Sequence, residues 1–192
     1  MPVAVIGGAG FIGSHLVDEL LVQQFEVHVI DNLSTGKMDN LRRWKGHPKL
    51  EFARVDASDE EVQKRFLDHK TWVFNFAPIH MPTLADNCML VDVQRLVNNN
   101  ENDLLSCDWE QTFPVVSLKM PSIYGPRGPK TGDMFVSDVV RANMMLAMNR
   151  EIIEVIDLSE RQFGGWKPLV DEKLGKQIME QYERANSLII MG

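Results

Sequence analysis

The hydrophobic positions of this chain form short apolar runs that alternate with stretches of helical spacing. The first run covers residues 3–6 and is continuous, as in a strand buried on both faces of a parallel sheet. Apolar residues then recur three and four positions apart as far as residue 24, which predicts an amphipathic helix. Further strands are predicted for five later segments, residues 26–30, 50–55, 72–76, 114–118 and 151–156.

The remaining helices are predicted from capping residues and from apolar spacing. Ser58 and Glu61 form a predicted capping box for a helix that ends near residue 69. Ser137 is predicted to cap a helix with buried valines and methionines that runs to residue 148. A weaker helical pattern covers residues 84–107, and apolar residues four apart over 170–182 predict a closing amphipathic helix.

Strands that alternate with helices predict an α/β protein with a doubly wound parallel sheet and helices on both faces. With 192 residues, the chain is long enough for one well-packed domain. We expect residues 1–157 to form the core. Residues 158–192 are expected to be a C-terminal helical extension packed on the same domain.

Composition excludes several classes of partner. The formal net charge is −7 and no basic block is present, which argues against binding to nucleic acid or anionic membranes. No apolar run is long enough to span a bilayer, and no basic and apolar leader precedes the first strand. Cys88 and Cys107 form no paired motif, which favours two reduced thiols. These features predict a cytoplasmic protein.

The segment from Val3 to Asp31 carries the clearest functional pattern. A strand leads into Gly7, Gly10 and Gly13, which open a helix, and a second strand ends in Asp31. In a Rossmann-type fold, such glycines permit a tight turn, approach of a pyrophosphate, and close packing of helix on strand. The helix start offers N–H donors to phosphates. A carboxylate at Asp31 accepts from ribose hydroxyls and repels a 2′-phosphate, so we expect NAD rather than NADP as cofactor. The alternative is a fold that has kept the turn but lost the ligand.

The sequence Gly-Gly-Ala-Gly-Phe-Ile-Gly-Ser-His-Leu at residues 7–16, with Val-Ile-Asp-Asn-Leu-Ser-Thr-Gly at 29–36, closely resembles the extended short-chain dehydrogenase/reductases. Within them it is most similar to the nucleotide-sugar group of UDP-glucose 4-epimerase and dTDP-glucose dehydratase. Similar segments follow in the family's order at 55–57, 73–78, 115–119, 123–127 and 135–143. The glycine loop and the resemblance together indicate these cofactor-binding residues: Gly7, Gly10, Phe11, Ile12, Gly13, Asp31, Asn32, Asp56, Ala57, Phe76 and Ala77.

The family's chemistry depends on a Tyr-x-x-x-Lys pair, and this chain lacks it. Tyr124 is followed four residues later by Gly128, and Tyr182 by Asn186. The segment between Pro78 and Pro114 is shorter than in the family. We therefore expect that the central strand with the catalytic Ser or Thr, and the helix with the Tyr and Lys, have been excised.

The substrate-binding part is reduced as well. The link from Pro129 to Phe135 is short, and Ser122 stands where relatives often carry a substrate-contacting asparagine. Family members usually dimerise through a helical bundle that includes the Tyr–Lys helix. The resemblance therefore implies a homodimer, but the expected excision would remove one helix of its interface. The ligands implied by the resemblance are a dinucleotide and a nucleotide sugar.

Three functions remain open at this point. The first is an NAD(H)-binding relative without the family's catalysis. The second is an active epimerase, dehydratase or oxidoreductase with another proton donor, for which Tyr124 near Lys119 or Lys130 and the loop carrying His80, Asp86 and Cys88 are candidates. The spacing of that loop matches no metal template, so no metal is expected. The third is an interaction protein that has lost the cofactor.

Overall fold

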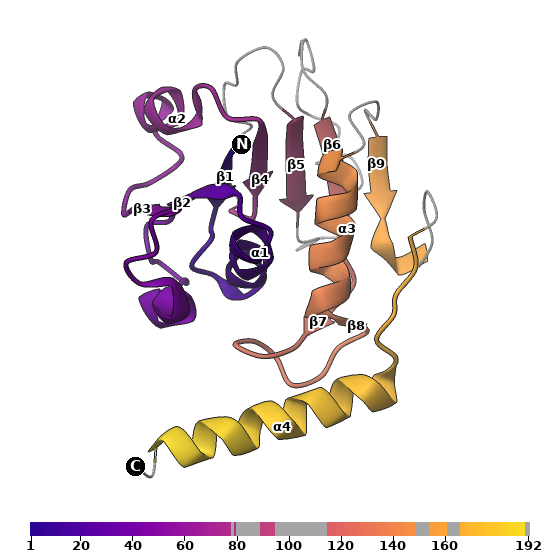
Figure 1. Cartoon of the computed structure of the whole chain (residues 1–192). Helices are drawn as coiled ribbons and strands as arrows, with labels where there is room; N and C mark the ends of the chain where they lie inside the picture. Colours follow the sequence, from indigo (N-terminus) through magenta and orange to yellow (C-terminus); the bar gives the residue numbers. More distant parts are fainter. Residues whose placement is uncertain (78, 80–88, 95–114, 149–153, 161–165, 191–192) are drawn as a thin grey trace.

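A parallel sheet of seven strands forms the centre of the molecule (Figure 1). The computed structural model describes residues 1–77, 79, 89–94, 115–148, 154–160 and 166–190. The order across the sheet is β3-β2-β1-β4-β5-β6-β9. The strands are β1 (Pro2–Ile6), β2 (Glu26–Ile30), β3 (Leu50–Ala53), β4 (Trp72–Asn75), β5 (Met89–Gln94), β6 (Val115–Lys119) and β9 (Glu154–Asp157).

Helices cover both faces of this sheet, as the alternating pattern predicted. The helices α1 (Phe11–Val22) and α3 (Val136–Met148) share one hydrophobic core with the sheet. The helix α2 (Glu60–Leu67) contributes Leu67 to a second core that includes Ala4 and Val73. Since neighbouring residues of a strand point to opposite faces, Ala4 and Val5 belong to different cores. The predicted fold class is confirmed.

The chain reverses its direction of winding between β1 and β4, which lie side by side in the sheet. From β1 the strands proceed outward through β2 to β3, and from β4 they proceed the other way. In open α/β sheets, ligands bind at the carboxyl ends of the strands at this switch point. The glycine loop follows β1 and Phe76 follows β4, so both lie at this position.

The helix predicted over residues 84–107 is wrong for Met89–Gln94, which forms β5 between β4 and β6. The rest of that prediction lies outside the described residues. Met89, Leu90 and Val91 are fully buried, so pairing with two neighbouring strands outweighs the weak helical spacing. The expected loss of a central strand is wrong too, because β5 occupies the position between β4 and β6. Its sequence, Met-Leu-Val-Asp-Val-Gln, carries an aspartate and no Ser or Thr.

Both predicted caps are wrong by one or two residues. The N-cap of α2 is Asp59, whose carboxylate accepts a hydrogen bond from Glu61 N at 2.9 Å. Ser58 instead donates through its backbone and hydroxyl to Asp56. Helix α3 begins at Val136, so Ser137 lies in its first turn. Asp and Ser both accept well from a helix start, so adjacent acceptors cannot be ranked by type alone.

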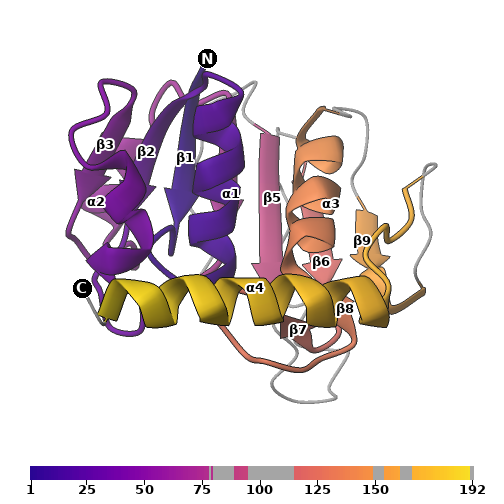
Figure 2. The ribbon, with the colours of Figure 1, turned by 60° about the horizontal axis from the view of Figure 1, so that its bottom comes forward.

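The predicted closing helix is present as α4 (Glu172–Ile190). It runs past the carboxyl ends of the sheet strands (Figures 1 and 2). Asp138 in α3 is buried and accepts from the backbone amides of Leu169 and Val170, which fixes the segment before α4. Within the described residues, no helix is both long and apolar enough to cross a membrane.

A small second sheet and two 3-10 helices complete the same end of the molecule. A small parallel sheet pairs β7 (Ile123–Tyr124) with β8 (Met134–Phe135) just before α3. A 3-10 helix, η1 (Met38–Trp44), follows the second strand, and another, η3 (Leu158–Glu160), follows β9. Of these elements, η1 and the loop between β7 and β8 contact α1, whose start lies at the candidate site.

Candidate functional site

The glycine loop is a tight turn between β1 and α1. Gly7 has φ +74°, a left-handed conformation that favours glycine, and its amide donates to Ile30 O at 2.8 Å. The amide of Gly10 donates to Gly7 O at 3.0 Å, which closes the turn. A Cβ at Gly13 would lie 2.3 Å from Gly7 O, so α1 packs directly on the turn. Gly7 and Gly13 therefore have the structural reasons, a tight turn and close packing of the helix, that their spacing predicted.

The start of α1 has backbone donors to offer. Gly10 is the N-cap and has no side chain to accept from the first turn. The first helical bond runs from Ser14 N to Gly10 O, so the amides of Phe11, Ile12 and Gly13 have no acceptor within the helix. Among the described residues, a Cβ at Gly10 would meet one atom, Gly7 O, at 3.1 Å, so that part of the chain leaves the space beside the turn open.

Asp31 lies at the end of β2, next to the glycine loop. Its Oδ2 accepts from Ala9 N at 2.9 Å, and its Oδ1 accepts from Leu33 N at 2.8 Å. The residue is buried, and these two bonds fix the plane of the carboxylate. Each carboxylate oxygen can accept more than one hydrogen bond, so both retain capacity toward a ligand. The glycine loop therefore fixes, through Ala9 N, the carboxylate that is predicted to accept hydrogen bonds from the ribose of the cofactor.

Asp56 and Ala57 follow β3 at the same edge of the sheet. Asn32 donates to Asp56 Oδ2 at 3.4 Å, so these two predicted residues are neighbours. Hydrogen bonds from the hydroxyl and amide of Ser58 lower the pKa of Asp56, with a smaller contribution from Asn32. Asp56 is exposed, whereas Ala57 is buried in the second core. Asp56 is therefore the polar member of this pair that a ligand can reach.

Phe76 and Ala77 leave β4 beside Gly7. The amide of Phe76 donates to Ile6 O, and a Cβ at Gly7 would contact Phe76 at 3.4 Å. The amide of Ala77 donates to Asn75 Oδ1 at 3.1 Å, and Asn75 Nδ2 donates to the buried Asp92 of β5 at 2.9 Å. These hydrogen bonds of Asn75 were not predicted from the sequence. The feature that could have indicated them is a single buried polar residue in each of two apolar strands, Asn75 in β4 and Asp92 in β5.

Tyr124 packs inside the molecule. Its ring meets Phe135 edge to face at 5.2 Å, and its hydroxyl would lie 2.0 Å from a Cβ at Gly175 of α4. Burial raises the pKa of Tyr124, and Glu172 adds to the shift. A phenol with a raised pKa is a poor base near neutral pH.

The lysines suggested as partners of Tyr124 form ion pairs elsewhere. Lys119 Nζ lies 3.2 Å from Asp157, and Lys130 Nζ lies 2.6 Å from Glu183. Ser122 donates its hydroxyl to Asp133 Oδ2 at 2.5 Å, which joins the residue before β7 to the residue before β8. The other candidates, His80, Asp86 and Cys88, lie outside the described residues, as does Cys107. In the part of the chain that is described, no group of three or more potential ligands could hold a metal ion.

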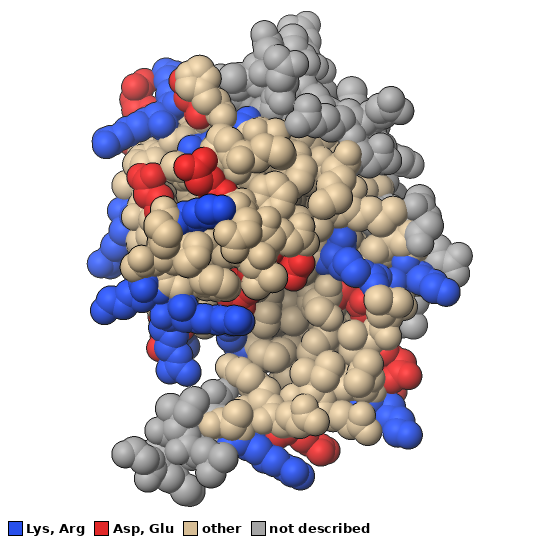
Figure 3. Space-filling view, in the orientation of Figure 1, with Lys and Arg blue, Asp and Glu red and all other residues tan. Residues whose placement is uncertain are grey.

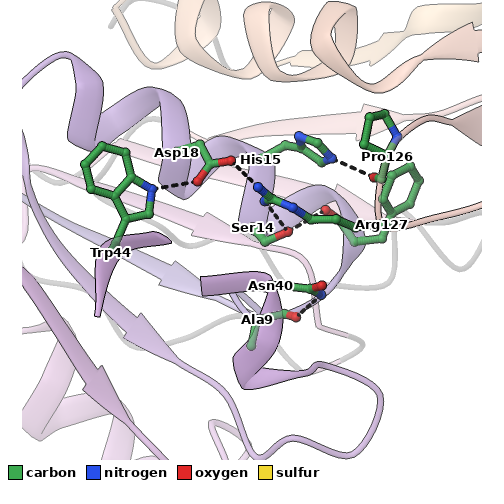
Figure 4. Close-up of polar contacts among 9 residues, drawn as sticks. Ala9, Ser14, His15, Asp18, Asn40, Trp44, Pro126 and Arg127 are labelled. Atoms are coloured by element: carbon green, nitrogen blue, oxygen red, sulfur yellow. Dashed lines mark hydrogen bonds and ion pairs between the residues drawn. The ribbon is translucent and has the colours of Figure 1, made fainter. Parts of the chain in front are cut away.

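A polar cluster that the sequence did not reveal joins three segments around α1 (Figure 4). Asp18 accepts from Trp44 Nε1 of η1 and from Arg127 Nη2, both at 2.6 Å. Arg127 Nη1 also donates to Ser14 Oγ at 3.1 Å. These bonds hold η1 and the loop after β7 against the helix that begins at the glycine loop.

Two further contacts extend this cluster. The imidazole Nε2 of His15 lies 2.7 Å from Pro126 O, and burial lowers the pKa of His15. Asn40 Nδ2 donates to Ala9 O at 2.8 Å, so η1 also touches the glycine loop itself.

Comparison with known families and proteins agrees with this geometry. Residues 4–83 match the family model of GDP-mannose 4,6 dehydratase. The chain is 53% identical to UDP-glucuronic acid decarboxylase 6 of Arabidopsis thaliana over 60 residues, which are 31% of this chain and 18% of that protein. It is 36% identical to a putative UDP-glucose 4-epimerase of Methanocaldococcus jannaschii over 87 residues, 44% of this chain and 27% of that protein. The resemblance to this enzyme group is confirmed. Each match spans less than a third of the curated relative.

Solved structures show the same fold. UDP-glucose 4-epimerase of Thermotoga maritima, solved with UDP-glucose, superposes with a TM-score of 0.74 at 20% identity, covering 97% of this chain and 99% of that one. dTDP-glucose 4,6-dehydratase of Bacillus anthracis, solved with NAD, superposes with a TM-score of 0.75 at 17% identity, covering 97% of both chains. These similarities establish the architecture.

Proposed function

We propose that this protein binds NAD(H) on the glycine loop and does not carry out the epimerase or dehydratase chemistry of its relatives. The observation that carries the proposal is the arrangement of Asp31 beside the turn of Gly7 and Gly10. The carboxylate is fixed by Ala9 N and Leu33 N, at the end of β2 where a ribose diol binds in a Rossmann fold. The open space at Gly10 and the uncapped amides of α1 suit a pyrophosphate.

The roles of the remaining cofactor residues follow from their places. Phe11, Ile12 and Gly13 would offer amides to the phosphates. Asp56 with Asn32 would contact the adenosine, and Ala57 would line that side. Phe76 and Ala77 would pass under the dinucleotide. Such a cofactor supplies a nicotinamide ring that exchanges hydride with a substrate. The protein would hold and orient it.

The absence of catalysis is inferred from Tyr124. Neither tyrosine of the chain has a lysine four residues later, and Tyr124 is enclosed by Phe135 and α4. Its raised pKa keeps the hydroxyl protonated at neutral pH. A nucleotide sugar therefore stays a candidate ligand, and a role as cofactor-binding subunit or sensor fits the retained residues better than turnover. The predicted cytoplasmic location and homodimer are part of the same proposal.

Cofactor choice tests the site. Titration calorimetry should show that NAD binds at least tenfold more tightly than NADP, because the 2′-phosphate would face the Asp31 carboxylate. In Asp31→Ala, this preference should fall toward unity. Asp68→Ala, which removes an exposed carboxylate paired with His69, should keep it. Equal affinities in the unaltered protein would contradict the role assigned to Asp31.

A further inference from the structure

A separate cavity lies between η1, the loop after β7, and α4. Its volume is about 210 Å³, and its lining residues are Asp39, Asn40, Arg42, Arg43, Arg127 and Tyr182. In Figure 3, Lys and Arg side chains gather above the hollow that separates this part of the molecule from α4. None of these six residues is among the proposed cofactor residues, and Asn40 joins the cavity to the glycine loop through Ala9 O.

The charges around the cavity do not cancel. Asp39 forms an ion pair with Arg42 at 3.5 Å, and Asp18 forms one with Arg127 at 2.6 Å. Within the described part of the chain, no carboxylate lies at ion-pair distance from Arg43, whose guanidinium is 5.0 Å from the centre of the Trp44 ring. One positive charge is therefore in excess, in a chain whose net charge is −7.

Arg127 is held in place before any ligand arrives. Its guanidinium is mostly buried and donates to both Ser14 and Asp18, and two of its five N–H groups satisfy these bonds. Its backbone has φ +66°, a conformation that non-glycine residues adopt uncommonly and that is enriched at ligand sites. A fixed guanidinium loses little freedom when it binds an anion.

We propose that this cavity binds the phosphate group of a phosphorylated small molecule. Guanidinium groups pair with phosphate oxygens through two parallel N–H bonds. The donors come from three segments of the chain, which suits a tetrahedral group with three terminal oxygens better than a planar carboxylate. The volume is below the range of about 300–1,000 Å³ of sites for drug-sized ligands, so the ligand is a small ester or phosphate itself.

The test is calorimetric titration of the cofactor-free protein with two probes at constant ionic strength, inorganic phosphate and glucose 1-phosphate. Saturable binding that weakens about tenfold in Arg43→Gln is expected. The matched control is Arg65→Gln on α2. Arg65 is likewise exposed and lies 5.2 Å from the ring of its neighbour Phe66, but it is not part of the cavity. This control should bind both probes like the unaltered protein.

The outcomes separate this site from the cofactor site. Tighter binding of glucose 1-phosphate would identify an ester as the ligand, and equal or tighter binding of inorganic phosphate would identify the free ion. Binding that is equal in Arg43→Gln and the unaltered protein would place phosphate elsewhere, for example at the glycine loop, and would overturn the proposal. Equal weakening in both variants would do the same, because it would reflect overall charge. Each result is independent of whether NAD binds.

Discussion

Gly10 and Gly13 differ in what a side chain at each position would contact. A Cβ at Gly10 would meet Gly7 O at 3.1 Å and no other atom of the described residues within 4 Å, whereas a Cβ at Gly13 would lie 2.3 Å from the same oxygen. The backbone of Gly10 has φ −73°, which alanine adopts without strain. Gly13 therefore serves packing, whereas Gly10 is proposed to serve a ligand.

We expect alanine to affect mainly NAD binding at position 10 and mainly protein stability at position 13. Gly10→Ala should weaken NAD binding by at least tenfold and change the free energy of unfolding by less than about 1 kcal/mol. Gly13→Ala should lower that free energy by about 1–3 kcal/mol, because the methyl group overlaps backbone. Calorimetry and urea unfolding measure the two quantities. If Gly10→Ala bound NAD normally, the loop would not be the phosphate site.

His15 is expected to make stability depend on pH. Burial lowers its pKa below the usual 6.5, so the unfolded chain binds the proton more readily than the folded one. The stability that it contributes is complete above pH 6.5 and is lost as the pH falls below that value. His15→Gln should therefore lose less unfolding free energy between pH 7.5 and 5 than the unaltered protein. The control variant is His69→Gln, which replaces an imidazole whose side chain is 90% exposed.

Part of that dependence should remain in His15→Gln, because burial also lowers the pKa of His28, with Lys70 contributing. Identical pH profiles of His15→Gln and the unaltered protein, measured by urea unfolding, would contradict the assignment.

At the scale of the elements, α4 packs closely against Tyr124 of β7 at Gly175. Gly175 is buried beside the hydroxyl of Tyr124, and a Cβ there would lie 2.0 Å from it. Replacing glycine by alanine inside a helix normally stabilises by about 1 kcal/mol. Here we expect Gly175→Ala to destabilise the protein by about 1–3 kcal/mol, since the helix must shift.

Removal of the hydroxyl should relieve this overlap. The double variant Gly175→Ala with Tyr124→Phe should regain part of the lost unfolding free energy, as measured by urea unfolding. Gln177→Ala, an exposed change on the same helix, should have an effect below about 0.5 kcal/mol. A stabilising Gly175→Ala would show that α4 does not rest on Tyr124.

The elements also show which parts of the fold local patterns can predict. The strand Glu26–Ile30 matches its predicted bounds because its two valines and its isoleucine favour a strand and the polar Asp31 and Asn32 follow directly. Met89–Gln94 was predicted as helix from its local apolar spacing. It is a strand because it hydrogen-bonds to β4 and β6, and this pairing is not visible in the local sequence. The cap at Asp59 depends on a choice between adjacent acceptors that only backbone geometry makes.

At the scale of the whole molecule, the glycine loop with Asp31 could be recognised from spacing, because its parts lie within 25 residues of one another. The cluster around Asp18 could not, since Arg127 is 109 residues away and reaches α1 only in the folded chain. The arginine-lined cavity has the same origin in three distant segments. A candidate site whose residues are close in the sequence can therefore be predicted from their spacing. Clusters whose residues meet only in the folded chain cannot.

The prediction that decides the function is that the purified chain shows no epimerase or dehydratase turnover on UDP- or dTDP-sugars with NAD present. A placed general acid or base contributes about 10²–10⁴ in rate, and positioning of the substrate contributes further. Tyr124 lacks the lysine that would lower its pKa, and burial shifts that pKa in the opposite direction. The segment between Pro129 and Phe135, where the resemblance implies substrate binding, is short as well.

The measurement is chromatography of products across a panel of nucleotide sugars, with an active UDP-glucose 4-epimerase run in parallel as the positive control. Because NAD binding is measured separately by calorimetry, a lack of turnover cannot be confused with a lack of cofactor. Turnover that disappears in Tyr124→Phe would make Tyr124 the catalytic acid and overturn the proposed function. Turnover that survives in Tyr124→Phe would overturn it equally and would direct attention to His80 and Cys88. Neither result would change the expected preference for NAD, which depends on Asp31 and not on a proton donor.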